Sequence, residues 1–445
     1  MFKHKKILIC GMAKSGQSAA RLLAQLGAYV SVQDMKTEIE WTYNHVEVGL
    51  ETYLGQNPDD IVHIFDLIII SPGISVYAPF VQKAEELGIP VWGEAELAYR
   101  LCPCPMLAIT GTNGKTTVTT LVGEILKLHN SGTVVGGNIG IPLTELVTTL
   151  AEENIVVAEI SSFQLETIAA FKPTISAVLN MTEDHLDRHR TMENYIAMKS
   201  RIFENQNEND ICVLNYDIEI TRTMKPPGHT VFFSTKEILQ QGVFLQDGYI
   251  IGKIGQHEQK IAQIATLKIM PENALAASAI ALCAGVSAEI IARGLRSFRG
   301  VPHRLEHIAT LNGVEYYNDS KATNTDAAIK AIEALQGPII LIGGGSDKDT
   351  DFTSWVQTFG EKVTNLIVLG ETTQKIVDTC KKLGFTRYEI TFSLQEAVAR
   401  AKALAKPGHK VLLSPACASF DMFKNFEERG EIFKEAVWQG EHVPY

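Results

Sequence analysis

One segment, residues 106–118 (MLAITGTNGKTTV), constrains the fold of this chain more than any other stretch of its sequence. Residues 107–109 are an apolar run with the length and composition of a buried strand. A glycine-rich turn follows, and Lys115 opens a helix with apolar residues at helical spacing. A strand, a tight loop and a helix in this order direct backbone N–H groups and a helix N-terminus at one point, as a phosphate site requires. The segment predicts such a site, with a positive charge from Lys115 and the hydroxyl of Thr116 where Mg²⁺ would sit.

This loop matches the general phosphate-loop pattern only in part. Gly111 and Gly114 are separated by two residues rather than four, and Ile109 stands at the position of the earlier glycine. An ordinary strand–loop–helix turn is therefore the alternative interpretation. The preceding strand, the following helix and the two glycines together favour nucleotide binding.

Length and composition exclude several classes of protein. A chain of 445 residues has room for roughly two to four domains. The formal net charge of −11 argues against a nucleic-acid partner. No apolar run is long enough to span a membrane, and the N-terminus lacks the apolar stretch of a signal peptide. Seven scattered cysteines do not form a disulfide framework, so we expect a cytoplasmic protein.

The N-terminal part of the chain alternates strands with helices. We expect strands over residues 6–10, 28–33, 67–70 and 90–92, with helices over 17–26 and 82–87. This order is typical of a Rossmann-like domain. The first loop is not G-x-G-x-x-G, so a nicotinamide cofactor is disfavoured, and a nucleotide or phosphate group is expected near Ser15, Lys36 and Gly73.

Two further α/β units follow. The second begins near Gly93 and is expected to have strands over residues 107–109, 154–160, 175–179 and 211–214, a β-rich excursion over 226–262 and a helix over 273–284. The third follows the break at residues 300–302 and is expected to have strands over 314–317, 338–342, 365–369 and 410–414. The chain therefore belongs to the α/β class.

Three side chains of the second unit have two interpretations each. Glu159 ends an apolar strand, where a carboxylate is either a Mg²⁺ ligand or a salt-bridged structural residue. His185 follows another buried strand and is either a ligand or an ordinary surface histidine. Lys199 falls in an apolar helical stripe, where it either extends to solvent or is buried with a lowered pKa. A neutral amine can add CO₂ and form a carbamate, which is an oxygen ligand suited to Mg²⁺.

Polar residues of the third unit are equally open to two interpretations. Asp319, Lys321 and Thr323 crowd one strand end and are either a site or a helix cap. Arg304 is either an anion- or base-binding residue or a surface feature. Lys348 follows a glycine turn and could meet a carboxylate. In the second unit, Asn273 opens a helix and could simply cap it.

Taken together, these motifs resemble the Mur ligase family, the ATP-dependent amino-acid-adding enzymes of peptidoglycan precursor synthesis. The resemblance covers essentially the whole chain. The general family motifs are residues 111–117 (GTNGKTT), 159–165 (EISSFQL) and 180–187 (NMTEDHLD). More specific motifs are residues 318–324 (NDSKATN) and 414–421 (SPACASFD), which resemble the D-glutamate-adding members. Other members carry an Asp-Tyr-Ala-His type sequence where this chain has residues 319–323.

The resemblance implies three domains and a reaction. The domains are a Rossmann-like UDP-substrate domain over residues 1–93, a central phosphate-loop ATPase-like domain with a parallel sheet over 94–301, and a Rossmann-like D-glutamate domain over 302–445. ATP would phosphorylate the carboxylate of UDP-N-acetylmuramoyl-L-alanine, and the amine of D-glutamate would attack the acyl phosphate. The implied cofactors are ATP and Mg²⁺ with a carbamylated Lys199, and the expected protein is a monomer without nucleic-acid or membrane partners.

The resemblance also assigns roles to individual residues. The implied catalytic residues are Lys115, His185, Lys199 and Lys321. The implied ATP-binding residues are Gly111, Thr112, Asn113, Gly114, Lys115, Thr116, Thr117, Asn273, Arg304 and Asp319. The implied metal ligands are Thr116 and Glu159 for one ion, and His185 and Lys199 for the other. The implied UDP-substrate residues are Ser15, Met35, Lys36, Gly73 and Asn138. The implied D-glutamate residues are Thr323, Lys348, Ser419, Phe420 and Phe426.

One segment departs from the family pattern. Family members usually carry Gly-x-His-Asn a few residues before the helix that Asn273 opens, and residues 267–272 (LKIMPE) lack it. The chain has either lost a short loop or binds the adenine edge differently. Folylpolyglutamate synthase shares the phosphate loop and is the alternative enzyme, although residues 318–324 argue against it. A non-catalytic nucleotide-binding module is the other alternative, and the full set of phosphate-loop and metal residues argues against that.

Overall fold

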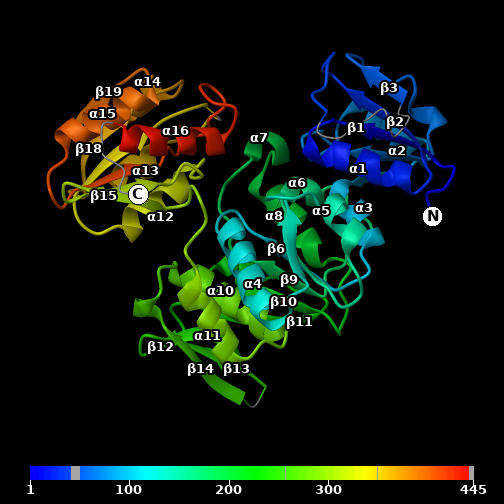
Figure 1. Ribbon diagram of the computed structural model, residues 1–445, viewed down its shortest axis with the longest axis horizontal. Coiled ribbons are helices and arrows are strands. Elements are labelled where there is room, and N and C mark those ends of the chain that lie inside the picture. The colour runs from blue at the N-terminus through cyan, green and yellow to red at the C-terminus, as the bar shows by residue number, and fades with distance from the viewer. Residues whose placement is uncertain (42–50, 256, 348, 440–445) are drawn as a thin grey trace. The chain divides into compact units, whose positions relative to one another are not determined.

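Three β-sheets flanked by helices organise the chain, and most of their strands run parallel (Figure 1). The computed structural model describes residues 1–41, 51–255, 257–347 and 349–439. Two units pack separately, residues 1–298 with the first two sheets and residues 299–445 with the third. None of the helices in these described ranges is both long and apolar enough to cross a membrane.

The first sheet has five parallel strands in the order β3-β2-β1-β4-β5. Its inner strands read as apolar runs because helices cover both faces. Strands β2 and β3 are added on one side of β1, and β4 and β5 on the other, so the strand order switches between β1 and β4. Open α/β sheets bind ligands beyond the carboxyl ends of the strands at such a switch point. The elements are β1 (Lys6–Cys10), α1 (Lys14–Gln25), β2 (Tyr29–Asp34), β3 (Glu51–Leu54), β4 (Leu67–Ile70), α2 (Pro79–Glu86), β5 (Val91–Gly93) and α3 (Glu94–Leu101).

The second sheet has nine strands in the order β14-β13-β12-β11-β10-β9-β6-β8-β7. Strands β6 to β12 are parallel, and β13 and β14 continue the sheet as an antiparallel edge. The glycine-rich, alternating segment that predicted a β-rich excursion supplies β11 to β14. The strands are β6 (Met106–Thr110), β7 (Thr133–Gly137), β8 (Ile155–Glu159), β9 (Ile175–Val178), β10 (Ile211–Asn215), β11 (His229–Ser234), β12 (Gly242–Gln246), β13 (Tyr249–Ile254) and β14 (His257–Gln263).

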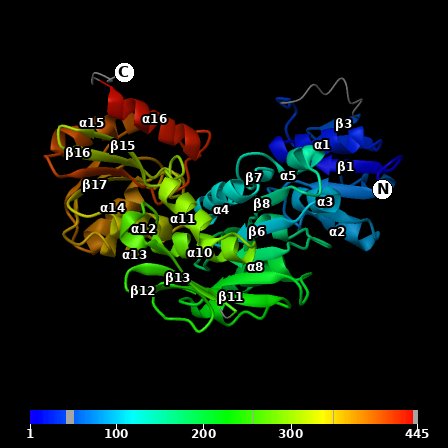
Figure 2. The ribbon, with the colours of Figure 1, turned by 60° about the horizontal axis from the view of Figure 1, so that its bottom comes forward.

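Helices cover both faces of this second sheet. On one face α4 packs against α10 and α11, as Figure 2 shows. On the other, apolar side chains of β6, β8, β9 and β10 form a core with α3, α5 and α6. The helices are α4 (Lys115–His129), α5 (Leu143–Leu146), α6 (Ser162–Leu165), α7 (Leu186–His189), α8 (Met192–Ser200), α9 (Glu219–Arg222), α10 (Pro271–Cys283) and α11 (Ala288–Ser297).

The third sheet has six strands in the order β15-β16-β20-β17-β18-β19, with only β15 antiparallel to its neighbour. Strands β16, β20 and β17 are adjacent, so the loops after their carboxyl ends share one edge. The elements are β15 (Glu306–Leu311), β16 (Val314–Asn318), α12 (Thr325–Ala334), β17 (Ile339–Gly343), α13 (Thr353–Gln357), β18 (Val363–Val368), α14 (Thr373–Lys382), β19 (Tyr388–Ile390), α15 (Leu394–Leu404), β20 (Lys410–Leu413) and α16 (Phe426–Trp438).

The structure corrects the sequence-based expectation at the first turn. Helix α1 begins at Lys14, so Ser15 lies in the helix rather than in a preceding turn. Gly16 permits this early start, because a Cβ on Gly16 would lie 2.0 Å from the carbonyl oxygen of Gly11. Four edge strands, β3, β7, β15 and β19, were not predicted, and β7 includes two residues of an expected glycine-rich turn over 136–140. All four are short or half-exposed and lack a long apolar run.

Candidate active site

The predicted phosphate loop joins β6 to α4, and its two glycines adopt conformations that other residues avoid. Gly111 has φ of 152°, and a Cβ there would approach the Cβ of Leu179 to 3.0 Å. Gly114 has φ of 82° and immediately precedes α4. A Cβ on Gly114 would lie 2.6 Å from Oδ1 of Asn273, which places the Asn273 side chain against the loop. The loop therefore presents bare backbone at the N-terminus of α4.

Lys115 folds back over this loop. Its Nζ donates hydrogen bonds to the carbonyl oxygens of Gly111 at 2.9 Å and Thr112 at 2.8 Å. Thr116 and Thr117 follow in the first turn of α4 and are buried, and within the described residues the Thr117 hydroxyl has no hydrogen-bond partner. The loop thus holds a cation and two hydroxyls at the N-terminus of α4, which is the chemistry that a polyphosphate requires.

Asn180, just after β9, clamps the loop from the neighbouring strand. Its Oδ1 accepts from the backbone N–H of Asn113 at 2.8 Å, and its Nδ2 donates to the carbonyl of Asn113 at 2.9 Å. Its own carbonyl accepts from the N–H of Thr112 at 3.1 Å. The sequence indicated Asn180 only as the start of a motif, because no local spacing reveals a contact across 67 residues.

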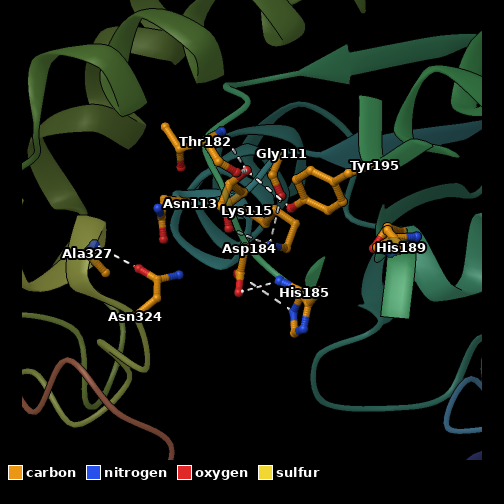
Figure 3. A network of polar contacts seen from close by, with 12 residues as sticks. Gly111, Asn113, Lys115, Thr182, Asp184, His185, His189, Tyr195, Asn324 and Ala327 are labelled. Atoms are coloured by element: carbon orange, nitrogen blue, oxygen red, sulfur yellow. Dashed lines mark hydrogen bonds and ion pairs between the residues drawn. The ribbon is translucent and has the colours of Figure 1, made fainter. Parts of the chain in front are cut away.

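A second set of contacts fixes Thr112, and Figure 3 labels two of its partners, Thr182 and Tyr195. Its hydroxyl donates to the carbonyl of Thr182, accepts from the N–H of Thr182, and lies 3.1 Å from the hydroxyl of Tyr195. Tyr195 is buried on α8, where burial raises the pKa of its phenol well above the usual value. The loop is therefore rigidly held before any nucleotide arrives, and Tyr195 is a second residue whose role the sequence did not reveal.

Glu159 ends β8 at the same edge of the sheet as the loop. It pairs with Ile109 of β6 across the ladder and is 1% exposed. One carboxylate oxygen, Oε1, accepts a 2.9 Å hydrogen bond from Nδ2 of Asn138. The other, Oε2, is buried and has no hydrogen-bond partner within the described residues. An orphaned buried carboxylate oxygen is costly, and a divalent cation such as Mg²⁺ would satisfy it, so this residue fits the metal that its sequence position suggests.

Lys199 lies near the end of α8 and is 2% exposed, so it does not extend to solvent. Its Nζ donates to the carbonyl of Gly111 at 2.9 Å and lies 4.8 Å from the centre of the Tyr195 ring. Burial, reinforced by the charge of Lys115, holds the pKa of Lys199 well below its ordinary range, although Asp184 and Glu159 oppose the shift. The neutral amine that a carbamate needs is thus favoured at this position.

His185 precedes α7 with a positive φ of 54°. Its Nε2 lies 3.6 Å from Oδ2 of Asp184 (Figure 3). Its ring contacts Phe163 edge-on at 4.8 Å between centroids. Across the described ranges, no group of three or more His, Cys, Asp and Glu side chains could hold a metal ion by itself. A metal ion bound here would therefore need hydroxyl, carbamate or nucleotide oxygens as further ligands.

Four of the five residues predicted for a UDP-substrate follow strands of the first sheet. Ser15 lies in the first turn of α1, and Met35 and Lys36 follow β2, where Met35 is 67% exposed. Gly73 follows β4 in open space. Asn138 comes instead from the loop after β7 in the second sheet. Its loop contacts the N-terminus of α1, because Nζ of Lys14 donates to the carbonyl of Gly140 at 2.8 Å.

In the C-terminal unit, Asp319 is buried at the end of β16. Its Oδ1 accepts from the N–H of Leu305 at 3.0 Å, and its Oδ2 accepts from the hydroxyl of Ser414 at 2.8 Å. Burial raises the pKa of Asp319 to about 6 despite the opposing charge of Arg304. The Nε of Arg304 is itself buried without a hydrogen-bond partner among the described residues.

Most residues predicted for D-glutamate lie near one edge of the third sheet. Lys321 follows β16, and its Nζ lies 5.0 Å from the ring centre of Phe426, the first residue of α16. Thr323 donates its N–H to the carbonyl of Lys321. Beyond β20, Ser419 is buried and Phe420 is 73% exposed. The remaining predicted residue, Lys348, lies outside the described residues.

Comparison with known proteins assigns the three sheets to a known set of domains. The family model for the MurD-like Mur ligase N-terminal domain matches residues 5–93. The Mur ligase middle domain matches residues 109–281, and the Mur ligase glutamate ligase domain matches residues 303–417.

Curated relatives and solved structures agree with these domain matches. Proteins named UDP-N-acetylmuramoylalanine–D-glutamate ligase are 47% identical in Thermoanaerobacter sp. and 46% identical in Alkaliphilus metalliredigens, each covering 98% of both chains. The structure of the UDP-N-acetylmuramate–alanine ligase MurC from Thermotoga maritima has a TM-score of 0.62 at 19% identity, over 98% of this chain and 100% of that one. MurF from the same organism, solved with ADP, has a TM-score of 0.58 at 16% identity, over 98% and 96%. The chain therefore belongs to the Mur ligase family.

Proposed function

We propose that this chain is the ATP-dependent ligase that joins D-glutamate to UDP-N-acetylmuramoyl-L-alanine in the synthesis of peptidoglycan precursors. Curated relatives of that name match the chain over its full length at 46–47% identity. The structural observation that carries the proposal is the buried Lys199 amine, hydrogen-bonded to the carbonyl of Gly111 in the phosphate loop. A domain that only binds nucleotide has no need of a second, buried amine there.

Phosphoryl transfer is the first half of the reaction. The γ-phosphoryl group of ATP would pass to a carboxylate oxygen of UDP-N-acetylmuramoyl-L-alanine, leaving ADP and an acyl phosphate. The N–H groups at the start of α4 would hold the β- and γ-phosphates, and Lys115 would exchange its bonds to loop carbonyls for bonds to phosphate oxygens. Asn273, beside Gly114, is positioned to contact the nucleotide. We assign Arg304 and Asp319 of the C-terminal domain to the same nucleotide.

Two magnesium sites fit the polar residues around the loop. Thr116 and Glu159 would hold one ion, and Glu159 offers the orphaned Oε2 for it. His185 and carbamylated Lys199 would hold the other. Carbamylation joins the Lys199 nitrogen to the carbon of CO₂ with loss of one proton, and the depressed pKa of Lys199 favours the reacting amine. Mg²⁺ supplies charge neutralisation for the transferring phosphoryl group and the substrate carboxylate.

Amide formation is the second half. The amine of D-glutamate would attack the carbonyl carbon of the acyl phosphate, and phosphate and one proton would leave the tetrahedral intermediate. We assign the amino acid to Lys321, Thr323, Lys348, Ser419, Phe420 and Phe426. The UDP moiety is assigned to Ser15, Met35, Lys36, Gly73 and Asn138.

Location and assembly complete the proposal. All seven cysteines are free thiols, as expected of a protein from a reducing compartment. We infer a cytoplasmic monomer whose partners are its small-molecule substrates. We also assign the UDP-substrate domain to residues 1–93, the ATP domain to 94–301 and the D-glutamate domain to 302–445.

Phosphate release tests the proposal. The enzyme would be supplied with ATP, Mg²⁺ and UDP-N-acetylmuramoyl-L-alanine, together with D-glutamate, L-glutamate, L-lysine or no amino acid. Release only with D-glutamate is expected. Release with a different amino acid would show that D-glutamate is not the substrate. Release with none of them, while ATP still binds, would refute catalysis.

A further inference from the structure

A buried arginine on α16 lies behind the residues assigned to D-glutamate, and neither the sequence motifs nor the proposed reaction uses it. Arg429 is 3% exposed and lies one turn into the helix that Phe426 begins. A fully buried guanidinium is rare unless its donors are satisfied, because its desolvation is costly. The partners of Arg429 therefore indicate why the charge is kept.

The guanidinium spans two loops of the third sheet. Its Nε and Nη2 donate to Oγ and the carbonyl oxygen of Ser320 at 2.9 and 2.7 Å, in the loop after β16. Its Nη2 and Nη1 donate to the carbonyl oxygens of Cys417 at 3.1 Å and Ala418 at 3.2 Å, in the loop after β20. Two of the three contacted residues are immediately next to an assigned D-glutamate residue, since Lys321 follows Ser320 and Ser419 follows Ala418.

A third loop joins the same point. The N–H of Ser346, in the loop after β17, donates to the carbonyl of Ala418 at 3.0 Å, so this oxygen is shared with Arg429. A Cβ on Gly345 would lie 2.2 Å from that oxygen and 3.2 Å from Nη1 of Arg429. The loops that follow three adjacent strands therefore converge on one planar group.

Helix α16 is tied to the same assembly. The hydroxyl of Ser320 accepts from Arg429 and donates to the carbonyl of Phe426 at 2.8 Å. The position of the Phe426 ring beside Lys321 thus depends on the Ser320–Arg429 contact. The rigid fork of arginine can hold several acceptors in fixed directions, whereas the single ammonium of lysine cannot.

The four acceptors are all neutral, so within the described part of the chain no hydrogen-bonded carboxylate cancels the buried charge. Burial lowers the pKa of Arg429 to about 10, which leaves the guanidinium charged at neutral pH. Asp319 and Asp421 are the carboxylates whose charges act on it. A dicarboxylate amino acid that binds to these loops would gain from this fixed positive charge.

We propose that Arg429 is a positioning residue that fixes the loops after β16, β17 and β20 relative to one another and thereby sets the affinity for D-glutamate. The proposal rests on the proposed function, because it takes the amino acid to be the ligand of these loops. Arg429 does not contact the substrate in this scheme. It acts through the backbone on either side of Lys321 and Ser419.

The test is a comparison of Michaelis constants in the full-length enzyme. Arg429→Met is expected to raise the KM for D-glutamate about tenfold or more, while the KM values for ATP and UDP-N-acetylmuramoyl-L-alanine stay within twofold. Arg429→Lys retains the charge but not the fork, and an intermediate rise is expected. Arg400→Met is the matched control, since Arg400 is an exposed arginine of the same domain paired with Glu389 at 2.7 Å. All three constants should stay within twofold in that variant.

Circular dichroism and thermal unfolding would reveal whether Arg429→Met folds. If it does not fold, a milder variant, Ser320→Ala, provides the test. Ser320→Ala removes one acceptor, and its effect on the KM for D-glutamate should be smaller and not additive with that of Arg429→Lys. A fall in kcat with every KM unchanged, or an equal rise of all three KM values, would overturn the positioning role. Failure of the proposed function is a different result, namely a wild-type enzyme without D-glutamate-dependent phosphate release.

Discussion

Replacing Asn180 by aspartate tests how strongly the rigidity of the phosphate loop contributes to nucleotide binding. The amide of Asn180 accepts from the N–H of Asn113 and donates to its carbonyl. Aspartate has the same shape and retains the first hydrogen bond. It cannot make the second, because an ionised carboxylate has no proton to donate.

The magnitude follows from these two contacts. Loss of one hydrogen bond costs about 1 kcal/mol. The carboxylate oxygen of aspartate would face the Asn113 carbonyl and leave that acceptor unsatisfied, which costs about 1 kcal/mol more. The unliganded loop can relax away from this contact, whereas the nucleotide-bound loop must keep its geometry. We therefore expect up to about 2 kcal/mol in binding, or an approximately 30-fold weaker affinity for ADP.

Titration of a fluorescent ADP analogue with Mg²⁺ measures this affinity without catalysis. Asn180→Ala separates the lost clamp from the added negative charge and should also weaken binding. Asn130→Asp is the matched control, because Asn130 likewise accepts from an N–H, that of Gly132, and donates to a carbonyl, that of Glu153, both at 2.8 Å. Asn130 lies at the far end of α4 from the phosphate loop. The affinity of the Asn130→Asp protein for the ADP analogue should therefore change less than twofold. An affinity within twofold of wild type in a folded Asn180→Asp protein would refute the clamp.

Three further predictions concern single ionisable residues. Lys199→Ala should abolish phosphate release, and added acetate should restore part of it by replacing the carbamate oxygens; failure of short carboxylic acids to rescue at any concentration would count against a carbamate. Glu159→Gln should raise the Mg²⁺ concentration needed for half-maximal nucleotide binding at least tenfold, and an unchanged magnesium titration would contradict the assigned ligand. Burial raises the pKa of Asp319 to about 6, against roughly 4 in an unfolded chain, so the folded form binds more protons between these values and its stability falls as the pH rises from 4 to 6. This loss, about 2 kcal/mol between pH 4.5 and 6.5, should be missing from Asp319→Asn when hydrogen exchange of β16 and β20 is compared at those two pH values, and equal pH dependence in both proteins would contradict it.

Much of the fold could be predicted because buried parallel strands leave a strong pattern in the sequence. Strands such as β6 and β17 have every residue buried and are followed directly by glycine turns, so their apolar runs and their ends are both visible. Edge strands lack this pattern. Only one face of β15 meets the core, and its residues EHIATL alternate too weakly to predict a strand.

Residues of the candidate site could be predicted where the local chain fixes them, and not where distant elements do. Groups fixed by the local chain, such as Gly114 and Lys115 at the start of α4, follow from the order of strand, loop and helix. Burial of Lys199 could not be predicted, since a lysine in an apolar stripe either extends to solvent or is enclosed, depending on which elements pack above it. The contact of Arg429 with Ser320 spans 109 residues, and no sequence spacing reveals such a pairing.

The hydrogen bond between Asn138 and Glu159 has a thermodynamic consequence. One amide joins a residue assigned to the UDP-substrate to a residue assigned to a metal ion. A ligand that reorients Asn138 must change how readily Glu159 accepts a cation, and reciprocity requires the cation to change the affinity for that ligand by the same factor. The affinities for substrate and magnesium are then coupled through this contact, and an inhibitor that engages Asn138 would show a potency that depends on the magnesium concentration.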